Sequence, residues 1–136
     1  MPAHLTHINP PSLTDSLAVG YSQIVVAKGR TVFIAGQVGW DAKGQMASPF
    51  EAEVRQALEN VRTALKEAGA STADVANVRY YIVGLTRERV GALSQALREL
   101  KMWDPKAPPA GTLVGVSALS RPEFNIEIEV YAALPD

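Results

Sequence analysis

Apolar and polar residues follow two different periods along this chain, and the period separates helices from strands. A period near 3.6 residues runs through 49–69 and again through 86–100, which predicts two amphipathic helices. The first apolar stripe consists of Val54, Leu58, Val61, Leu65 and Ala68, and the second consists of Val90, Leu93, Leu97 and Leu100. Charged residues lie mostly off the stripes, so each helix is expected to bury one face.

Residues with known capping preferences mark the helix starts. Ser48, Pro49 and Glu51 suit the cap, the first and the third positions of the first helix. Thr86 is expected to begin the second helix. The segment Ser71–Asp74 predicts a single capped turn before the strand that follows.

Runs rich in β-branched and aromatic residues predict strands at 24–27, 31–35, 78–83, 112–119 and 125–131. Lys28-Gly29-Arg30 separates the first two by a short glycine-containing turn, so they are expected to form a β-hairpin. Residues 1–15 contain Pro10-Pro11 and are expected to form an extended N-terminal arm.

The element order β-β-α-β-α-β-β predicts an α+β fold with a mixed sheet, formed by residues 1–136 as a single domain. Two helices cannot cover both faces of such a sheet, so both are expected on one face. Tyr80, Ile82, Val114 and Val116 make the strands apolar. An oligomer is therefore expected to cover the other face.

Composition narrows the class of function. The net charge is −1 and no block of like charge occurs, which argues against a nucleic-acid-binding surface. The absence of cysteine excludes disulfides, thiolate–zinc sites and a cysteine nucleophile, and His4 and His7 alone make no convincing metal site. The sequence contains neither a secretory signal nor an apolar run long enough to span a membrane. A cytoplasmic protein is expected.

Four stretches in the same order resemble the Rid family, also called YjgF or endoribonuclease L-PSP. They are Gly20-Tyr21-Ser22-Gln23, Phe33–Val38, Gln56–Val61, and the end region with Pro109-Ala110 and Ile126–Glu129. The resemblance extends from about Gly20 to Ala132. It implies a chorismate-mutase-like (YjgF) fold, a homotrimer, and ligand sites in the clefts between neighbouring subunits. It also implies hydrolysis of reactive imines, such as tautomers of 2-aminoacrylate, to a 2-keto acid and ammonia, without a metal or an organic cofactor.

The resemblance assigns catalytic roles to two residues. Glu127 matches the glutamate that positions the attacking water, and Tyr21 matches a tyrosine of the pocket. The sequence pattern alone also allows simpler interpretations. Glu127 and Glu129 alternate with apolar residues, as surface charges on any half-exposed strand do. By residue type alone, a tyrosine such as Tyr21 is more often a half-buried packing residue with a satisfied hydroxyl.

The expected substrate-binding residues are Ala35, Gly36, Gly111, Thr112 and Leu113. Active family members have an arginine at the position of Gly111, and its guanidinium holds the substrate carboxylate. Glycine cannot provide this two-pronged contact. Ala35 replaces a serine that is common in the family, while the backbone near Gly36 and Leu113 is expected to face the ligand. Arg79 and Arg121 are candidates to replace the missing anchor, or are ordinary solvated charges.

Three hypotheses follow for function. The first is a deaminase-type hydrolase that acts on an imine or enamine, with weak activity on small 2-imino acids because Gly111 replaces the arginine. The second is a non-catalytic trimer that binds a small metabolite in the same cleft. The third is an interaction protein whose clefts are vestigial. Function depends on the site, so the fold does not choose among them.

Overall fold

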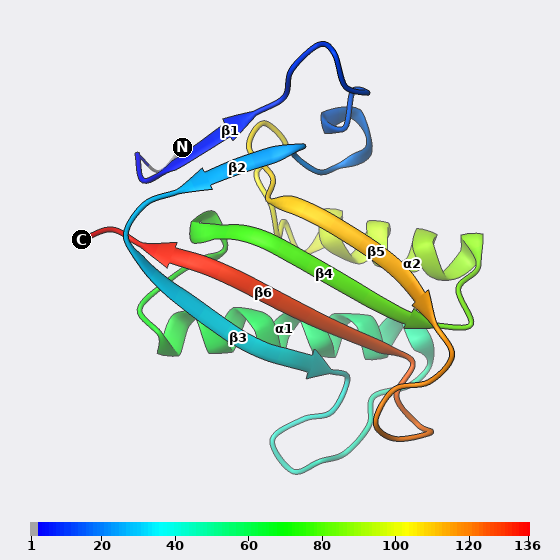
Figure 1. Cartoon of the computed structure of the whole chain (residues 1–136). Coiled ribbons are helices and arrows are strands. Elements are labelled where there is room, and N and C mark those ends of the chain that lie inside the picture. The colour runs from blue at the N-terminus through cyan, green and yellow to red at the C-terminus, as the bar shows by residue number, and fades with distance from the viewer. Residues whose placement is uncertain (1–2) are drawn as a thin grey trace.

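A four-stranded sheet forms the centre of the molecule (Figure 1) in the computed structural model, which describes residues 3–136. Its strands, in spatial order, are β3 (Arg30–Val38), β6 (Ile126–Leu134), β4 (Val75–Val83) and β5 (Ala110–Val116). β4 and β5 are parallel, whereas β6 pairs antiparallel with both β3 and β4. The sheet is therefore mixed, as the sequence predicted.

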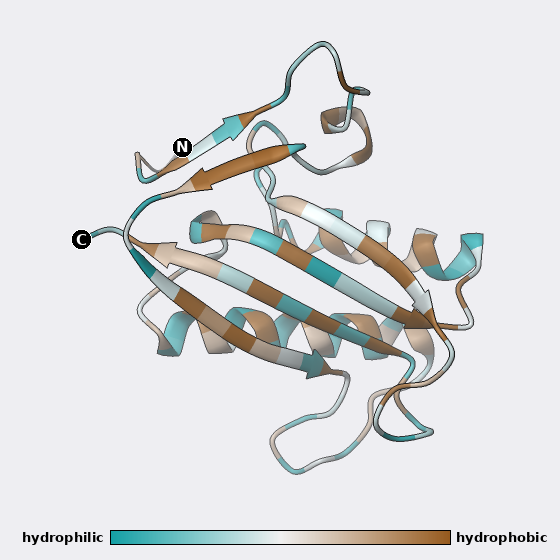
Figure 2. Ribbon diagram, in the orientation of Figure 1, coloured by the Kyte–Doolittle hydropathy of each residue, from teal (hydrophilic) through white to brown (hydrophobic). Residues whose placement is uncertain are grey.

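Both long helices, α1 (Phe50–Glu67) and α2 (Arg87–Glu99), cover one face of this sheet. The core forms where the apolar stripe of α1 packs against alternate residues of the strands. Its fully buried members include Val54, Leu58, Val61, Leu65, Ile82, Ile126, Ile128 and Val130. Figure 2 shows the corresponding alternation of apolar and polar residues along β6. The predicted placement of the helices on one face is confirmed.

The helix starts agree with the sequence only in part. Thr86 caps α2, because its side chain accepts a hydrogen bond from the backbone N–H of Arg89 at 3.1 Å. Ser48 was expected to cap α1, but Pro49 occupies the N-cap position and no side-chain cap forms there. Ala68 was expected in the buried stripe, but it lies at the C-cap and is exposed because the last turn extends beyond the sheet.

The β-hairpin predicted for 24–27 and 31–35 does not form. β2 (Ile24–Ala27) pairs with β1 (Leu5–Ile8) in a separate two-stranded sheet, whereas β3 pairs with β6. Gly29 between them has φ +117°, and a Cβ there would overlap the carbonyl group of Leu134 at the end of β6. The connection therefore carries the chain from one sheet to the other.

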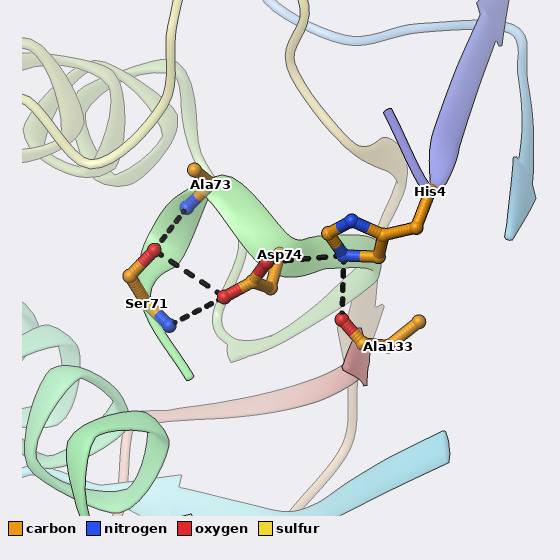
Figure 3. A network of polar contacts seen from close by, with 5 residues as sticks. All are labelled: His4, Ser71, Ala73, Asp74 and Ala133. Carbon is orange, nitrogen blue, oxygen red and sulfur yellow. Dashed lines mark hydrogen bonds and ion pairs between the residues drawn. The ribbon is translucent and has the colours of Figure 1, made fainter. Parts of the chain in front are cut away.

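The N-terminal arm expected over residues 1–15 is only partly extended and unpaired. Residues 1–2 lie outside the described part of the chain, and β1 was not predicted. Its Leu5 is buried, and His4 anchors it to the domain. The Nε2 atom of His4 lies 2.8 Å from the carbonyl oxygen of Ala133 and 3.0 Å from Oδ1 of Asp74 (Figure 3). Tertiary contacts, which have no local signature, order this segment.

The short turn predicted at Ser71–Asp74 is confirmed as the 3-10 helix η2 (Thr72–Asp74). Oδ2 of Asp74 accepts the backbone N–H of Ser71 at 2.8 Å, and the Ser71 side chain accepts the N–H of Ala73 (Figure 3). These reciprocal bonds form a capping box. The turn places Asp74 where its second oxygen can meet His4.

No part of residues 3–136 covers the face of the sheet that points away from the helices, on which large apolar side chains are exposed. Phe33 is 72% exposed on it and Val114 is 38% exposed. Tyr80 and Ile82 were expected to contribute to this open face, but they alternate with Tyr81 and point into the helix-side core. The Tyr80 hydroxyl accepts a hydrogen bond from Nε1 of Trp103 at 3.1 Å. No helix within residues 3–136 is long and apolar enough to cross a membrane.

Candidate functional site

Glu127 lies on the open face of the sheet, near the start of β6. It is half-buried, and its side chain lies over Gly36, where a Cβ would overlap the Glu127 carboxylate. The pairing of β3 with β6 shifts between Ile34 and Gln37, which brings the backbone of Gly36 under the glutamate. Only glycine leaves room for this approach. The structure thus brings two of the predicted site residues, Glu127 and Gly36, into contact.

A second polar cluster lies beside Glu127 on the same face. Glu129 accepts a hydrogen bond from the Tyr81 hydroxyl at 3.1 Å and one from Nη1 of Arg79 at 3.3 Å. The Arg79 guanidinium also stacks over Tyr131, 5.3 Å from the ring centroid. Partial burial and the bond to Glu129 raise the pKa of the Tyr81 phenol above its ordinary value, so Tyr81 remains a donor at neutral pH.

The two glutamates of β6 therefore differ in their environment. The Tyr81 hydroxyl and the Arg79 guanidinium both donate to Glu129, whereas no group within residues 3–136 donates a hydrogen bond to Glu127. The sequence did not predict the cluster. Strand alternation could have placed Tyr81 and Arg79 on one face, but the register that brings them to Glu129 comes from the pairing of β4 with β6.

Tyr21 and Gly111 form a separate contact at the β5 edge of the sheet. Ser22 bonds through its backbone N–H to the carbonyl oxygen of Pro109 at 3.0 Å and through its hydroxyl to that of Pro108 at 2.6 Å. These bonds hold Tyr21 against the start of β5. A Cβ at Gly111 would lie 3.4 Å from Cβ of Tyr21 and 3.7 Å from Cγ1 of Val78.

Within one protomer, Glu127 and Tyr21 belong to different regions. Gly111, which contacts Tyr21, pairs with Val78, whereas Glu127 pairs with Tyr81. Three residues along a strand correspond to about 10 Å. Successive residues also alternate between faces, so a Cβ at Gly111 would point to the helix side and Glu127 points to the open side. A single protomer does not bring the two residues together.

The remaining predicted residues lie on the two edge strands of the sheet, Ala35 on β3 and Thr112 and Leu113 on β5. Ala35 is exposed and its carbonyl oxygen accepts a bond from Nε2 of Gln37 at 3.0 Å. Thr112 is exposed on the open face opposite Arg79, and the side chain of Leu113 packs against the helix-side core. Leu113 can therefore meet a ligand only through its backbone.

Both arginines considered as replacement anchors already have partners. Arg79 is bonded to Glu129, and the Arg121 guanidinium lies 5.3 Å from the centroid of the Trp40 ring. No group of three or more histidine, aspartate or glutamate side chains suited to a metal ion occurs in the described residues. Two hollows of about 890 and 570 Å³ flank Trp103, and neither is lined by Glu127 or Tyr21.

Comparison with known proteins identifies the family. The family model described as Endoribonuclease L-PSP matches residues 14–134, almost the whole chain. The chain belongs to this family, the Rid family. A RutC family protein of Pyrococcus horikoshii is 33% identical to this Rid protein over 114 residues, which are 82% of this chain and 85% of the relative.

Solved structures agree with this assignment. The Rid family protein YyfB from Yersinia pestis is 34% identical, with a TM-score of 0.87, and the match covers 96% of this chain and 99% of YyfB. RidA from an Antarctic Psychrobacter is 28% identical, with a TM-score of 0.68, and the match covers 84% of this chain and 88% of RidA. The YjgF-type α+β fold predicted from the sequence is confirmed.

Proposed function

We propose that this Rid protein hydrolyses an imine, or an enamine through its imine tautomer, to a carbonyl compound and ammonia. Glu127 gives the main support. Its half-buried carboxylate has no hydrogen-bond donor within residues 3–136, although Glu129 on the same strand accepts two bonds. A carboxylate with free acceptor positions can orient a water molecule and take its proton.

The reaction needs only water and this one carboxylate. Glu127 would accept a proton from water while the water oxygen bonds to the imine carbon, and the nitrogen would take up a proton to give a carbinolamine. The carbon–nitrogen bond would then break as the nitrogen gains a further proton and the hydroxyl loses its own. The products are a carbonyl compound and ammonia, so atoms and charge balance without an oxidant or a reductant.

The proposed reaction site is a cleft between neighbouring subunits of a homotrimer. The open face, on which Phe33 and Val114 are exposed, is the surface that a second copy of the chain would cover, since large exposed apolar side chains mark contact surfaces. In such an assembly Glu127 of one subunit would face Tyr21 and Gly111 of a neighbour. Backbone amides near Gly36 and Leu113 would polarise the substrate, and Tyr21 would shape the pocket.

The proposed substrate lacks a small carboxylate group. Gly111 provides no cation beside Tyr21, and Arg79 and Arg121 are engaged elsewhere. Slow turnover of small 2-imino acids is therefore expected. The same observation favours a second candidate function, in which the trimer binds a metabolite without converting it.

The variants Glu127→Gln and Glu123→Gln test the proposal. Glu123 is an exposed glutamate in the loop before β6 and serves as the control. In an ammonia-release assay with a simple ketimine, Glu127→Gln is expected to lower kcat by about a hundredfold or more, the usual contribution of a general base. Glu123→Gln should behave as the wild type, and light scattering should show the same oligomer for all three. Wild-type turnover by Glu127→Gln would refute the assigned role, and binding without any turnover would favour the non-catalytic alternative.

A further inference from the structure

A buried carboxylate on α1 holds the start of β6, directly before Glu127. Glu53 is only 3% exposed. Its Oε2 atom accepts the backbone N–H of Asn125 at 2.7 Å and that of Ile126 at 3.3 Å, and its Oε1 atom accepts Nδ2 of Asn125 at 2.9 Å. All three contacts join residues more than seventy positions apart in the sequence.

The charged residues of α1 were expected to lie mostly off its buried stripe, and Glu53 is an exception. A buried carboxylate is costly unless its oxygens are well hydrogen-bonded. Every group that hydrogen-bonds to the Glu53 carboxyl group is an N–H donor, which matches its two acceptor oxygens. Glu53 also lies in the first turn of α1, where the helix dipole favours negative charge. The spacing of Glu53 to buried Ala57, four residues on, is the sequence signal that could have revealed its burial.

The same turn of α1 also contacts the end of β3. A Cβ at Gly39 would overlap the side chain of Glu53, so the backbone of β3 passes closely over the carboxylate stem. Farther along the helix, Nδ2 of Asn60 donates to the carbonyl oxygens of Val38 at 2.9 Å and Trp40 at 2.8 Å. α1 therefore fixes the end of β3 and the start of β6 together. Val38 and Glu127 are partners in the register between these two strands.

We propose that Glu53 is a positioning residue for Glu127. By holding the Asn125–Ile126 backbone against α1, it sets the point at which β6 begins, and so keeps the Glu127 carboxylate over Gly36 and directed at the open face. The value of this arrangement for catalysis rests on the proposed function. The arrangement itself does not, because it is a property of the folded chain.

Two substitutions at Glu53 and one control test the proposal by NMR. Glu53→Ala removes all three acceptor contacts, whereas Glu53→Gln keeps the shape of the side chain and one oxygen. Glu51→Gln is the matched control, an exposed glutamate in the same helical turn. Two quantities are measured at neutral pH: amide hydrogen exchange of Asn125 and Ile126, and the ¹³C resonance of the Glu127 side-chain carboxyl, assigned with Glu127→Gln.

In Glu53→Ala, exchange of the two amides is expected to accelerate about tenfold or more, as for loss of hydrogen bonds to a charged group. The Glu127 resonance should move toward that of exposed glutamates. Glu53→Gln should show smaller changes in the same direction. If the alanine variant does not fold, the same two measurements on Glu53→Gln test the proposal. Glu51→Gln should show neither change. If amide exchange is faster but the Glu127 resonance does not move, Glu53 has only a structural role and the proposal is wrong. No change in either quantity would also overturn the proposal. Because neither measurement needs turnover, failure of imine hydrolysis would not be mistaken for failure of the positioning role.

Discussion

Replacing Gly111 with arginine is expected to increase hydrolysis of small 2-imino acids by this Rid protein. The site can accept a side chain. The φ angle of Gly111 is not in the positive range, and a new Cβ would make ordinary contacts of 3.4 Å with Tyr21 and 3.7 Å with Val78. Glycine inside a strand lowers stability by about 0.5–1 kcal/mol relative to alanine, so the added Cβ should not itself weaken the fold.

The expected gain follows from the cost and benefit of one guanidinium. A charge-assisted pair with a desolvated carboxylate changes the binding free energy by roughly 2–5 kcal/mol. Ordering the arginine side chain costs about 2 kcal/mol. The net gain is therefore at most about 3 kcal/mol, which at about 1.4 kcal/mol per factor of ten corresponds to an increase in kcat/KM of up to roughly a hundredfold.

The assay is ammonia release from 2-iminopropanoate generated enzymatically in the same cuvette. Gly111→Gln is the control, because it adds a flexible polar side chain without a positive charge, although a shorter one. We expect the increase in Gly111→Arg only, with the same oligomeric state as the wild type. If Gly111→Arg folds and assembles normally but is no faster than Gly111→Gln, position 111 does not face the substrate carboxylate and the assignment of the Tyr21–Gly111 region is wrong.

Two further predictions concern the sheet face and the N-terminal strand. Phe33 is 72% exposed on the open face, and Phe33→Glu places a charge there, so light scattering should show that the oligomer dissociates. Val19 is 74% exposed on η1 (Leu17–Val19), and the control Val19→Glu should leave the oligomer intact. An oligomer that survives Phe33→Glu would show that this face is not the interface. Burial lowers the pKa of His7, whose ring nitrogens are shielded and unpaired within residues 3–136. The unfolded chain therefore binds a proton at His7 more strongly than the folded chain does. Stability should consequently fall as the pH drops below about 6.5. Thermal unfolding of His7→Leu should depend less on pH between about 7.5 and 5.5, and equal pH dependence in both proteins would contradict the assignment.

The sequence alone predicted the two helices, the identity of most strands and the α+β class. These features depend on local periodicity, because a helix or a strand buries whichever residues recur at its own repeat. Thr86 and Ser71 show the same locality, since each caps a turn with atoms only two or three residues away. The order of motifs from Gly20 to Ala132 also identified the family, which the match over residues 14–134 confirms.

Strand partners were decided by the tertiary structure. β2 and β3 are adjacent in the sequence and look like a hairpin, yet each lowers its free energy more by pairing elsewhere, β3 with the long β6 and β2 with the unpredicted β1. Pairing depends on which distant surface is available to be buried, and no local pattern contains that information. The same reason explains why His4, expected in an extended arm, is anchored to Asp74 and Ala133.

The candidate site also combines features that the sequence predicted with features that the tertiary structure decided. Sequence and resemblance selected Glu127, Tyr21, Gly36 and Gly111 as residue types suited to the chemistry. The fold distinguished Glu127 from Glu129, because the register of β4 against β6 supplies donors to one carboxylate and leaves the other without them. It also buried Glu53, whose three donors come from Asn125 and from Ile126 at the start of β6, which only the complete sheet brings to α1. Side-chain chemistry is a property of each residue, whereas hydrogen-bond partners are a property of the assembled backbone.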